Sequence, residues 1–286
     1  MTDAPYRLTM PRELTTSVVF SSPHSGRNYP GAFLQQSMLN ERQVRTSEDA
    51  FVDLLYQTAP DAGAPLLVAL APRAFVDLNR ASDELDPAVI EGLGKISPNP
   101  RVSSGLGVIP RVVANGRAIR SGKMPIAEAQ TRINHYWWPY HDRLTTLLHD
   151  AHARFGHAIL IDCHSMPHEA LDNLTRRGKA RPQVVLGDRF GASASQHIVD
   201  HIEAAFQNAG LHVVRNSPFA GGYITQHYGR PSRHQHAVQI EIDRSLYMNE
   251  QLIRPNGNFD AFCSLMQRVI AEIADLGRSQ QKLAAE

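Results

Sequence analysis

Short apolar runs rich in β-branched residues alternate with longer amphipathic segments along most of this 286-residue chain. The predicted strands are residues 17–21, 65–70, 158–162, 183–186, 211–214 and 237–242, and the predicted helices are residues 47–57, 126–155, 192–208 and 259–276. Such an alternation favours a mostly parallel sheet with helices on both faces, and nearly continuous apolar runs such as AILID fit its buried central strands. The sequence therefore predicts an α/β fold.

The chain is long enough to bury a large core, and it contains neither an internal repeat nor a low-complexity linker. We therefore expect residues 1–286 to form a single domain. Residues 81–123 differ from the rest because they are rich in Gly, Pro, Ser and Asn and have little periodicity. A structureless segment of that length is uncommon unless it serves a function, so we expect a functional loop region there.

Charge and composition exclude several classes of protein. The formal net charge is +1 and no long basic run is present, so a nucleic-acid partner is not expected. No apolar stretch approaches the ~18 residues that would indicate a membrane helix. The polar N-terminus lacks the apolar centre of a signal peptide, and two cysteines do not make a disulfide framework. These features predict a cytoplasmic protein.

Polar side chains follow or interrupt several of the predicted strands. In open α/β sheets, ligands bind beyond the carboxyl ends of the strands, so these side chains should meet at one edge. The first and third strands run into His24 and His164, and the last strand carries Glu241. The second strand is followed by the string APRAFVDLNR, which supplies Arg73, Asp77, Asn79 and Arg80.

Each of these residues has a plainer alternative. A histidine at a strand end is commonly a capped or solvated residue, but two at one edge, each beside Ser and Pro, favour a metal site. Glu241 is costly to bury unless it is functional or ion-paired, and the sequence leaves both open. Arg73 and Arg80 are either surface residues or forked anion binders. The acids Glu48 and Asp49 are either metal ligands or helix caps, which also stays open.

Eight strings occur in one order between residues 18 and 276. They are VVFSSPHSGRNYP, TSEDAFVDLLY, PRAFVDLNR, IPR, YWWPYHDRL, LIDCHSMP, VVLGD and QIEIDRSLYMNE. Any one of them is a weak signal, but together they resemble the N-formylglutamate amidohydrolase (N-formylglutamate deformylase) family. The resemblance implies a fold similar to zinc carboxypeptidases, with a mixed, mostly parallel sheet sandwiched by helices.

The resemblance also implies a metal site. His24 and His164 match the two histidine ligands, and the acidic ligand comes from the string SED, where Asp49 fits the family pattern best and Glu48 is the alternate. Zinc is the expected ion because mixed His and carboxylate ligands suit it, although such a site also accepts other divalent transition metals. One departure concerns the His-x-x-Glu motif of zinc carboxypeptidases, because Arg27 stands three residues after His24.

Further roles follow from the same resemblance. Glu241 matches the catalytic carboxylate of this fold, and Arg111 is expected to contact an anion or the oxyanion. Asn79 and Arg80 resemble the Asn-Arg pair that grips a substrate carboxylate in carboxypeptidases. Arg73, after the second strand, and Tyr228, near the Gly221-Gly222 turn, are expected to bind substrate from their positions in the sequence rather than from the resemblance.

The implied reaction is hydrolysis of N-formyl-L-glutamate to formate and L-glutamate by zinc-activated water, with Glu241 as general base. The substrate is a small dianion, the family context is histidine degradation, and the chain is expected to be a monomer or a small homo-oligomer. The alternatives are a deacylase of another N-acyl amino acid or small peptide, and a non-catalytic binder of acidic metabolites. A cysteine hydrolase is disfavoured because the neighbours Cys163 and His164 point to opposite faces of a strand.

Overall fold

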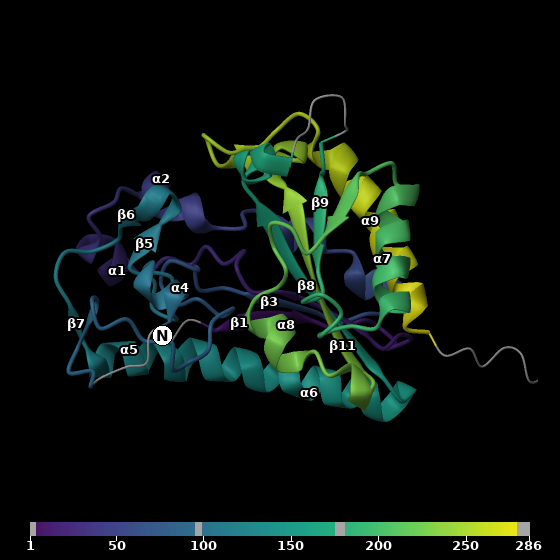
Figure 1. Cartoon of the computed structure of the whole chain (residues 1–286), viewed down its shortest axis with the longest axis horizontal. Helices are drawn as coiled ribbons and strands as arrows, with labels where there is room; N and C mark the ends of the chain where they lie inside the picture. The colour runs from purple at the N-terminus through teal and green to yellow at the C-terminus, as the bar shows by residue number, and fades with distance from the viewer. Residues whose placement is uncertain (1–3, 95–98, 175–180, 279–286) are drawn as a thin grey trace, which may run out of the picture.

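The computed structural model describes residues 4–94, 99–174 and 181–278 and is built around a seven-stranded sheet (Figure 1). The strand order across the sheet is β1-β3-β2-β8-β11-β9-β10. The strands are β1 (Tyr6–Thr9), β2 (Val18–Ser22), β3 (Leu66–Ala69), β8 (Ala158–Met166), β9 (Val184–Gly187), β10 (Val213–Arg215) and β11 (Gln235–Asp243). All six predicted strands are present within a few residues of their expected bounds.

The sheet is mixed and mostly parallel, as expected. Strands β3, β2, β8 and β11 run parallel to one another and form its centre. Strand β9 is antiparallel to β11, and β10 is parallel to β9. Strand β1 is antiparallel to β3 at the other edge, and its half-exposed side chains explain why no apolar run marked it in the sequence.

Side chains of the central strands alternate between two cores. Val18 and Phe20 belong to one hydrophobic cluster, and Val19 between them belongs to the other. The first cluster is covered by α7 (Gln196–Asn208) and α9 (Phe259–Leu276), which lie side by side in Figure 1. The second cluster is covered by α6 (Trp138–Phe155), which packs against β2 and β8. The sheet is therefore sandwiched by helices, as predicted.

The long helices agree with the sequence pattern. Residues 259–276 are helical over the predicted range, and α7 begins four residues later than predicted because Ser195 is extended. The predicted helix 126–155 is α5 (Ile126–Arg132), a π-helical stretch (Ile133–Trp137) and α6 in direct succession. No helix in the described ranges is long and apolar enough to cross a bilayer.

The predicted helix 47–57 is wrong over most of its length. The chain instead forms a 3₁₀ turn at Arg45–Ser47, becomes extended at Glu48, turns at Phe51 with φ 67°, and is helical only in α3 (Val52–Leu55). The backbone N–H of Asp49 donates to the carbonyl oxygen of His24 at 3.0 Å. That bond holds Asp49 out of any helix and against the loop after β2.

The described residues of the segment 81–123, which are 81–94 and 99–123, cover the carboxyl edge of the sheet on the α6 side. Their apolar side chains, including Val108 and Ile109, join the same core as α6. The elements here are β4 (Ile90–Glu91), α4 (Pro100–Ser103), β5 (Val112–Val113) and β6 (Arg117–Ala118), followed by β7 (Met124–Pro125). The remaining short α-helices and strands are α1 (Gly31–Gln36), α2 (Glu41–Val44), α8 (Tyr223–Tyr228), β12 (Met248–Asn249) and β13 (Arg254–Pro255).

Candidate metal and active site

His24 lies in the tight turn that follows β2. The turn rests against the chain leaving β3, where a Cβ on Gly26 would come within 2.1 Å of the carbonyl oxygen of Ala71, so only glycine fits. The Nε2 atom of His24 lies 2.7 Å from Oδ1 of Asp77. The other ring nitrogen, Nδ1, is buried and has no hydrogen-bond partner among the described residues.

His164 lies near the end of β8, on the same face as α6. Its Nδ1 atom is 2.8 Å from Oδ2 of Asp49, and its Nε2 atom is 3.0 Å from Oδ2 of Asp162. Asp162 precedes His164 by two residues, so the period of the strand places both side chains on one face. Cys163, between them, is buried in the opposite core, and this excludes the nucleophile–base pair considered for Cys163 and His164.

His24, Asp49 and His164 form the cluster that fits a metal ion in the described part of the chain. One ligand atom from each lies within 4.8 Å of the other two, and all three side chains are buried. Each histidine holds its far nitrogen on a carboxylate, which is how metal-bound histidines are usually oriented. The unpartnered Nδ1 of His24 faces the same point, so the donor set of two nitrogens and one oxygen suits zinc or a similar divalent metal.

The electrostatics of this cluster favour positive charge at its centre. Burial opposes ionisation of Asp49, but hydrogen bonds and charge from His164 and His24 hold the pKa of Asp49 well below its ordinary value. Burial likewise opposes protonation of His164, yet Asp162 and Asp49 hold the pKa of His164 well above its ordinary value. A divalent cation would balance the charge of the same carboxylates without protonation of the histidines.

Glu241 stands beside the cluster on the neighbouring strand. It is paired in register with His164 across β11 and β8, and its Oε1 accepts a hydrogen bond from Nε2 of Gln239 at 2.8 Å. Burial, and to a lesser degree the charge of Asp49, raises the pKa of Glu241 to about 7. A carboxylate with that pKa can accept a proton near neutral pH and release it again.

Asp49, Glu241 and Asp77 line a cavity of about 370 Å³, which we call the inner cavity. Its volume suits a small molecule. Much of its wall comes from the segment 81–123, so the expected functional role of that segment agrees with its position. The residues that line the inner cavity are Thr46, Ser47, Asp49, Arg73, Asp77, Ser104, Leu106, Pro110, Val112, Val113, Ala114, Asn115, Gly116, Ser165, Met166, Pro167, Phe219, Glu241 and Arg244.

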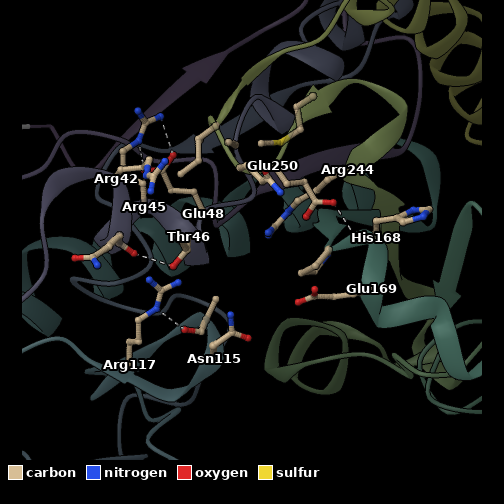
Figure 2. A pocket seen from close by; sticks show the side chains of 17 residues that line it. Arg42, Arg45, Thr46, Glu48, Asn115, Arg117, His168, Glu169, Arg244 and Glu250 are labelled. Carbon is tan, nitrogen blue, oxygen red and sulfur yellow. Dashed lines mark hydrogen bonds and ion pairs between the residues drawn. The ribbon is translucent and has the colours of Figure 1, made fainter.

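A second cavity of about 540 Å³, the outer cavity, adjoins the first (Figure 2). The two share the lining residues Thr46, Ala114, Asn115, Pro167 and Arg244, so they lie side by side. Figure 2 shows Arg42, Arg45 and Arg117 on one side of the outer cavity and Arg244, His168, Glu169 and Glu250 on the other. The inner cavity, where the reacting groups lie, therefore adjoins a cavity with charged walls.

Two arginines reach the inner cavity. Nε of Arg73 donates to Oδ2 of Asp77 at 3.0 Å, and Nη2 of Arg244 donates to Oδ1 of Asp49 at 2.9 Å. No role was predicted for Arg244, although it stands three residues after Glu241 in the string QIEIDRSLYMNE. The orienting roles of Asp77 and Asp162 were also missed. Asp162 stands two residues before His164, which is a signal that could have found it, whereas Asp77 is 53 residues from His24 in the sequence.

Asn79 and Arg80 lie behind the cluster and are not among the residues that line the inner cavity. The Nδ2 atom of Asn79 lies 3.3 Å from Asp162 and 3.1 Å from Nε2 of His164. The guanidinium of Arg80 donates to the carbonyl oxygens of Leu106 and Asn79, at 2.8 and 2.7 Å. Both side chains are committed to contacts inside the protein.

Arg111 and Tyr228 also lie away from the lining of the inner cavity. Nε of Arg111 donates to Oδ2 of Asp86 at 2.8 Å, within the segment 81–123. Tyr228 is buried on α8, with its hydroxyl 2.9 Å from Nδ1 of His141. Glu48 accepts hydrogen bonds from Arg45 and from the hydroxyl of Tyr29, so Asp49 is the acid that faces the histidines.

Comparisons with known proteins show the family of the chain. The model of the family described as N-formylglutamate amidohydrolase matches residues 16–248. N-formylglutamate deformylase from Pseudomonas aeruginosa is 34% identical over 242 residues, which are 82% of this chain and 83% of that protein. The protein of that name from Pseudomonas putida is 31% identical over 240 residues, 82% of each chain.

Solved structures show the same relationship. The crystal structure of N-formylglutamate amidohydrolase from Ralstonia eutropha JMP134 is 34% identical, with a TM-score of 0.89 over 96% of this chain and 98% of that one. A protein from Agrobacterium tumefaciens, at 15% identity and a TM-score of 0.68, shares the fold. Fold, site and relatives define a hydrolase of amide C–N bonds. The chain belongs to the N-formylglutamate amidohydrolase family.

Proposed function

We propose that this chain hydrolyses N-formyl-L-glutamate to formate and L-glutamate, with residues 1–286 acting as one catalytic domain. The observation that carries the proposal is the buried cluster of His24, Asp49 and His164, with Glu241 beside it on the inner cavity. The names of the relatives supply the substrate. The cavity volume and the two arginines on its wall suit a small dianion.

The proposed metal ligands are Nδ1 of His24, Nδ1 of His164 and a carboxylate oxygen of Asp49. Asp77 and Asp162 hold the opposite ring nitrogens and so fix the orientation of both histidines. When bound, a zinc ion supplies a Lewis acid that polarises the formyl oxygen and makes water acidic enough to attack near neutral pH.

Glu241 is the proposed general base and acid. Its carboxylate accepts a proton from the attacking water as the new C–O bond forms. It then delivers that proton to the amide nitrogen as the C–N bond breaks, so that formic acid and the amine are released; the remaining water proton then passes from formic acid to the amine, which gives formate and the ammonium form of L-glutamate. The pKa of about 7, raised by burial, keeps both protonation states of Glu241 within reach.

Arg73 and Arg244 are the proposed contacts for the substrate carboxylate next to the amide. Each lines the inner cavity. Arg73 keeps guanidinium hydrogens beyond its bond to Asp77, and Arg244 keeps those of Nη1 beyond its bonds to Asp49 and Ser165. Their committed contacts give Asn79 and Arg80 a supporting role: Asn79 positions Asp162 and His164, and Arg80 anchors the segment at Leu106. Arg111 and Tyr228 likewise stabilise the surrounding chain.

The test is formate release by protein stripped of metal and then supplied with Zn²⁺, using N-formyl-L-glutamate with N-acetyl- and N-succinyl-L-glutamate in parallel. We expect zinc-dependent release of formate and slower turnover of the larger acyl groups. Preferred turnover of a larger acyl group would replace the formyl substrate by another N-acyl amino acid. Absence of any turnover, with binding of the acidic ligands retained, would replace the enzyme by a binding protein.

A further inference from the structure

Some arginines that line the outer cavity are paired with a carboxylate, and others are not. Arg45 forms a two-pronged pair with Glu48, at 2.9 and 3.2 Å, and Arg244 is bound to Asp49. Arg42 and Arg117 line the same cavity, and neither makes an ion pair with any residue of the described ranges. Unpaired guanidinium groups in a concave site are suited to binding an anionic group of a ligand.

Arg117 is joined to the inner cavity by the hairpin that carries it. Strands β5 and β6 are connected by Ala114, Asn115 and Gly116, with Asn115 at φ 60° and Gly116 at φ 66°, and this turn lines the inner cavity. Arg117 is the next residue, and its Nε lies 3.5 Å from the carbonyl oxygen of Ala114. The side chain therefore folds beside the turn that forms the boundary between the two cavities.

The opposite wall carries the acids Glu169 and Glu250, together with Arg244, which is already bound to Asp49. His168, Glu169 and Glu250 stand across the outer cavity from Arg117 in Figure 2, and Glu250 accepts a hydrogen bond from the backbone of His168. Glu48, on the arginine side, accepts hydrogen bonds from Arg45 and Tyr29, and the charge of Arg45 balances its own. A carboxylate that enters the outer cavity is thus repelled by one wall and attracted by the other.

In N-formyl-L-glutamate, one carboxylate is next to the amide and the distal carboxylate is two methylene groups farther along the side chain. A substrate with its formyl amide at the cluster and its first carboxylate in the inner cavity would extend its distal carboxylate towards the adjoining outer cavity. We infer that Arg117 binds this distal carboxylate and thereby selects glutamate over amino acids with neutral side chains. This inference rests on the proposed function and adds a specificity-determining residue to it.

The test compares N-formyl-L-glutamate with N-formyl-L-glutamine, which has the same shape without the distal charge. For Arg117→Gln we expect kcat/KM on the glutamate compound to fall by roughly 10- to 100-fold, mainly through KM, because a charge-assisted hydrogen bond is lost. The same variant should change kcat/KM on the glutamine compound by less than about threefold. Arg117→Lys should restore part of the preference, because it restores the charge without the fork.

Arg42→Gln is the matched variant, since Arg42 is an unpaired arginine of the same cavity on α2. We expect it to keep the wild-type preference for the charged substrate. The inference is overturned if Arg117→Gln keeps that preference, or if Arg42→Gln loses it instead. A wild-type protein that hydrolyses neither compound would contradict the proposed function itself, so the two failures are distinguishable.

Discussion

Each histidine of the cluster uses its two ring nitrogens differently. One nitrogen is held by a buried carboxylate, Asp77 for His24 and Asp162 for His164, and the other faces Asp49. Orientation by an outer carboxylate fixes the tautomer before any ligand binds. Among the described residues, Glu241 is hydrogen-bonded by Gln239 alone, and it lines the inner cavity.

Replacing Glu241 by Gln tests its role directly. The amide keeps the shape and the bond to Gln239 but cannot accept a proton, so turnover should fall by about 10²- to 10⁴-fold while the metal stays bound. The measurement is kcat for formate release, with metal content per chain as the control. Near-normal turnover in a variant that binds metal would remove Glu241 from proton transfer.

At the scale of residues, the sequence predicts the position of a side chain where the backbone alone determines it. His24, His164 and Glu241 stand at or near strand ends, so their meeting at one edge follows from a parallel sheet. The direction of a long side chain does not follow from the backbone, so the bonds from Arg80 to Leu106 and from Arg111 to Asp86 could not be predicted. For the same reason, the position of Arg244 at the inner cavity could not be predicted.

At the scale of elements, His141 connects three parts of the chain. It lies on α6, its Nε2 is 2.9 Å from the carbonyl oxygen of Leu78, and its Nδ1 is 2.9 Å from the hydroxyl of Tyr228 on α8. The carbonyl requires a proton on Nε2, so Nδ1 accepts from Tyr228 and the ring is neutral. Burial lowers the pKa of His141 to about 3.

This lowered pKa makes the packing of α6 on α8 sensitive to acid. Between pH 6.5 and pH 3 the unfolded chain binds a proton at this histidine and the folded chain does not, so stability is lost as pH falls through that window. His141→Gln keeps a donor and an acceptor but cannot titrate. Its free energy of unfolding should fall less steeply below pH 6.5, by up to about 1.4 kcal/mol per pH unit.

The measurement is chemical unfolding at several pH values between 4 and 7, at fixed ionic strength. His149→Gln, an exposed histidine on the same helix, is the control and should keep the wild-type slope. Identical slopes for His141→Gln and the wild type would show that His141 does not contribute to acid sensitivity.

Elements with strong periodicity were predictable, and the metal segment was not. The amphipathic pattern of α9 gives its bounds to the residue. Residues 47–57 have a helical sequence, but the bond from Asp49 to His24 and the left-handed turn at Phe51 override that preference. A tertiary contact that draws one acid into a site cannot be recognised from local propensity.

For the whole molecule, the sequence predicts the mixed, mostly parallel sheet and the edge that carries the site, because both follow from the order of strands and helices. It does not reveal the two adjoining cavities, since these depend on how the described part of the segment 81–123 folds over that edge. The cytoplasmic location, the place in histidine degradation and the monomer or small homo-oligomer stay predictions.

The central claim is that one metal ion at His24, Asp49 and His164 makes this chain an N-formylglutamate hydrolase. The most direct measurement is metal content per chain together with formate release for Asp49→Asn and for its neighbour Glu48→Gln. Both acids are buried, but only Asp49 faces the histidines, while Glu48 is bound by Arg45 and Tyr29. We predict that Asp49→Asn loses metal and formate release together, with metal affinity lowered roughly 100-fold or more, and that Glu48→Gln keeps both. Wild-type metal content and turnover in Asp49→Asn would contradict the account.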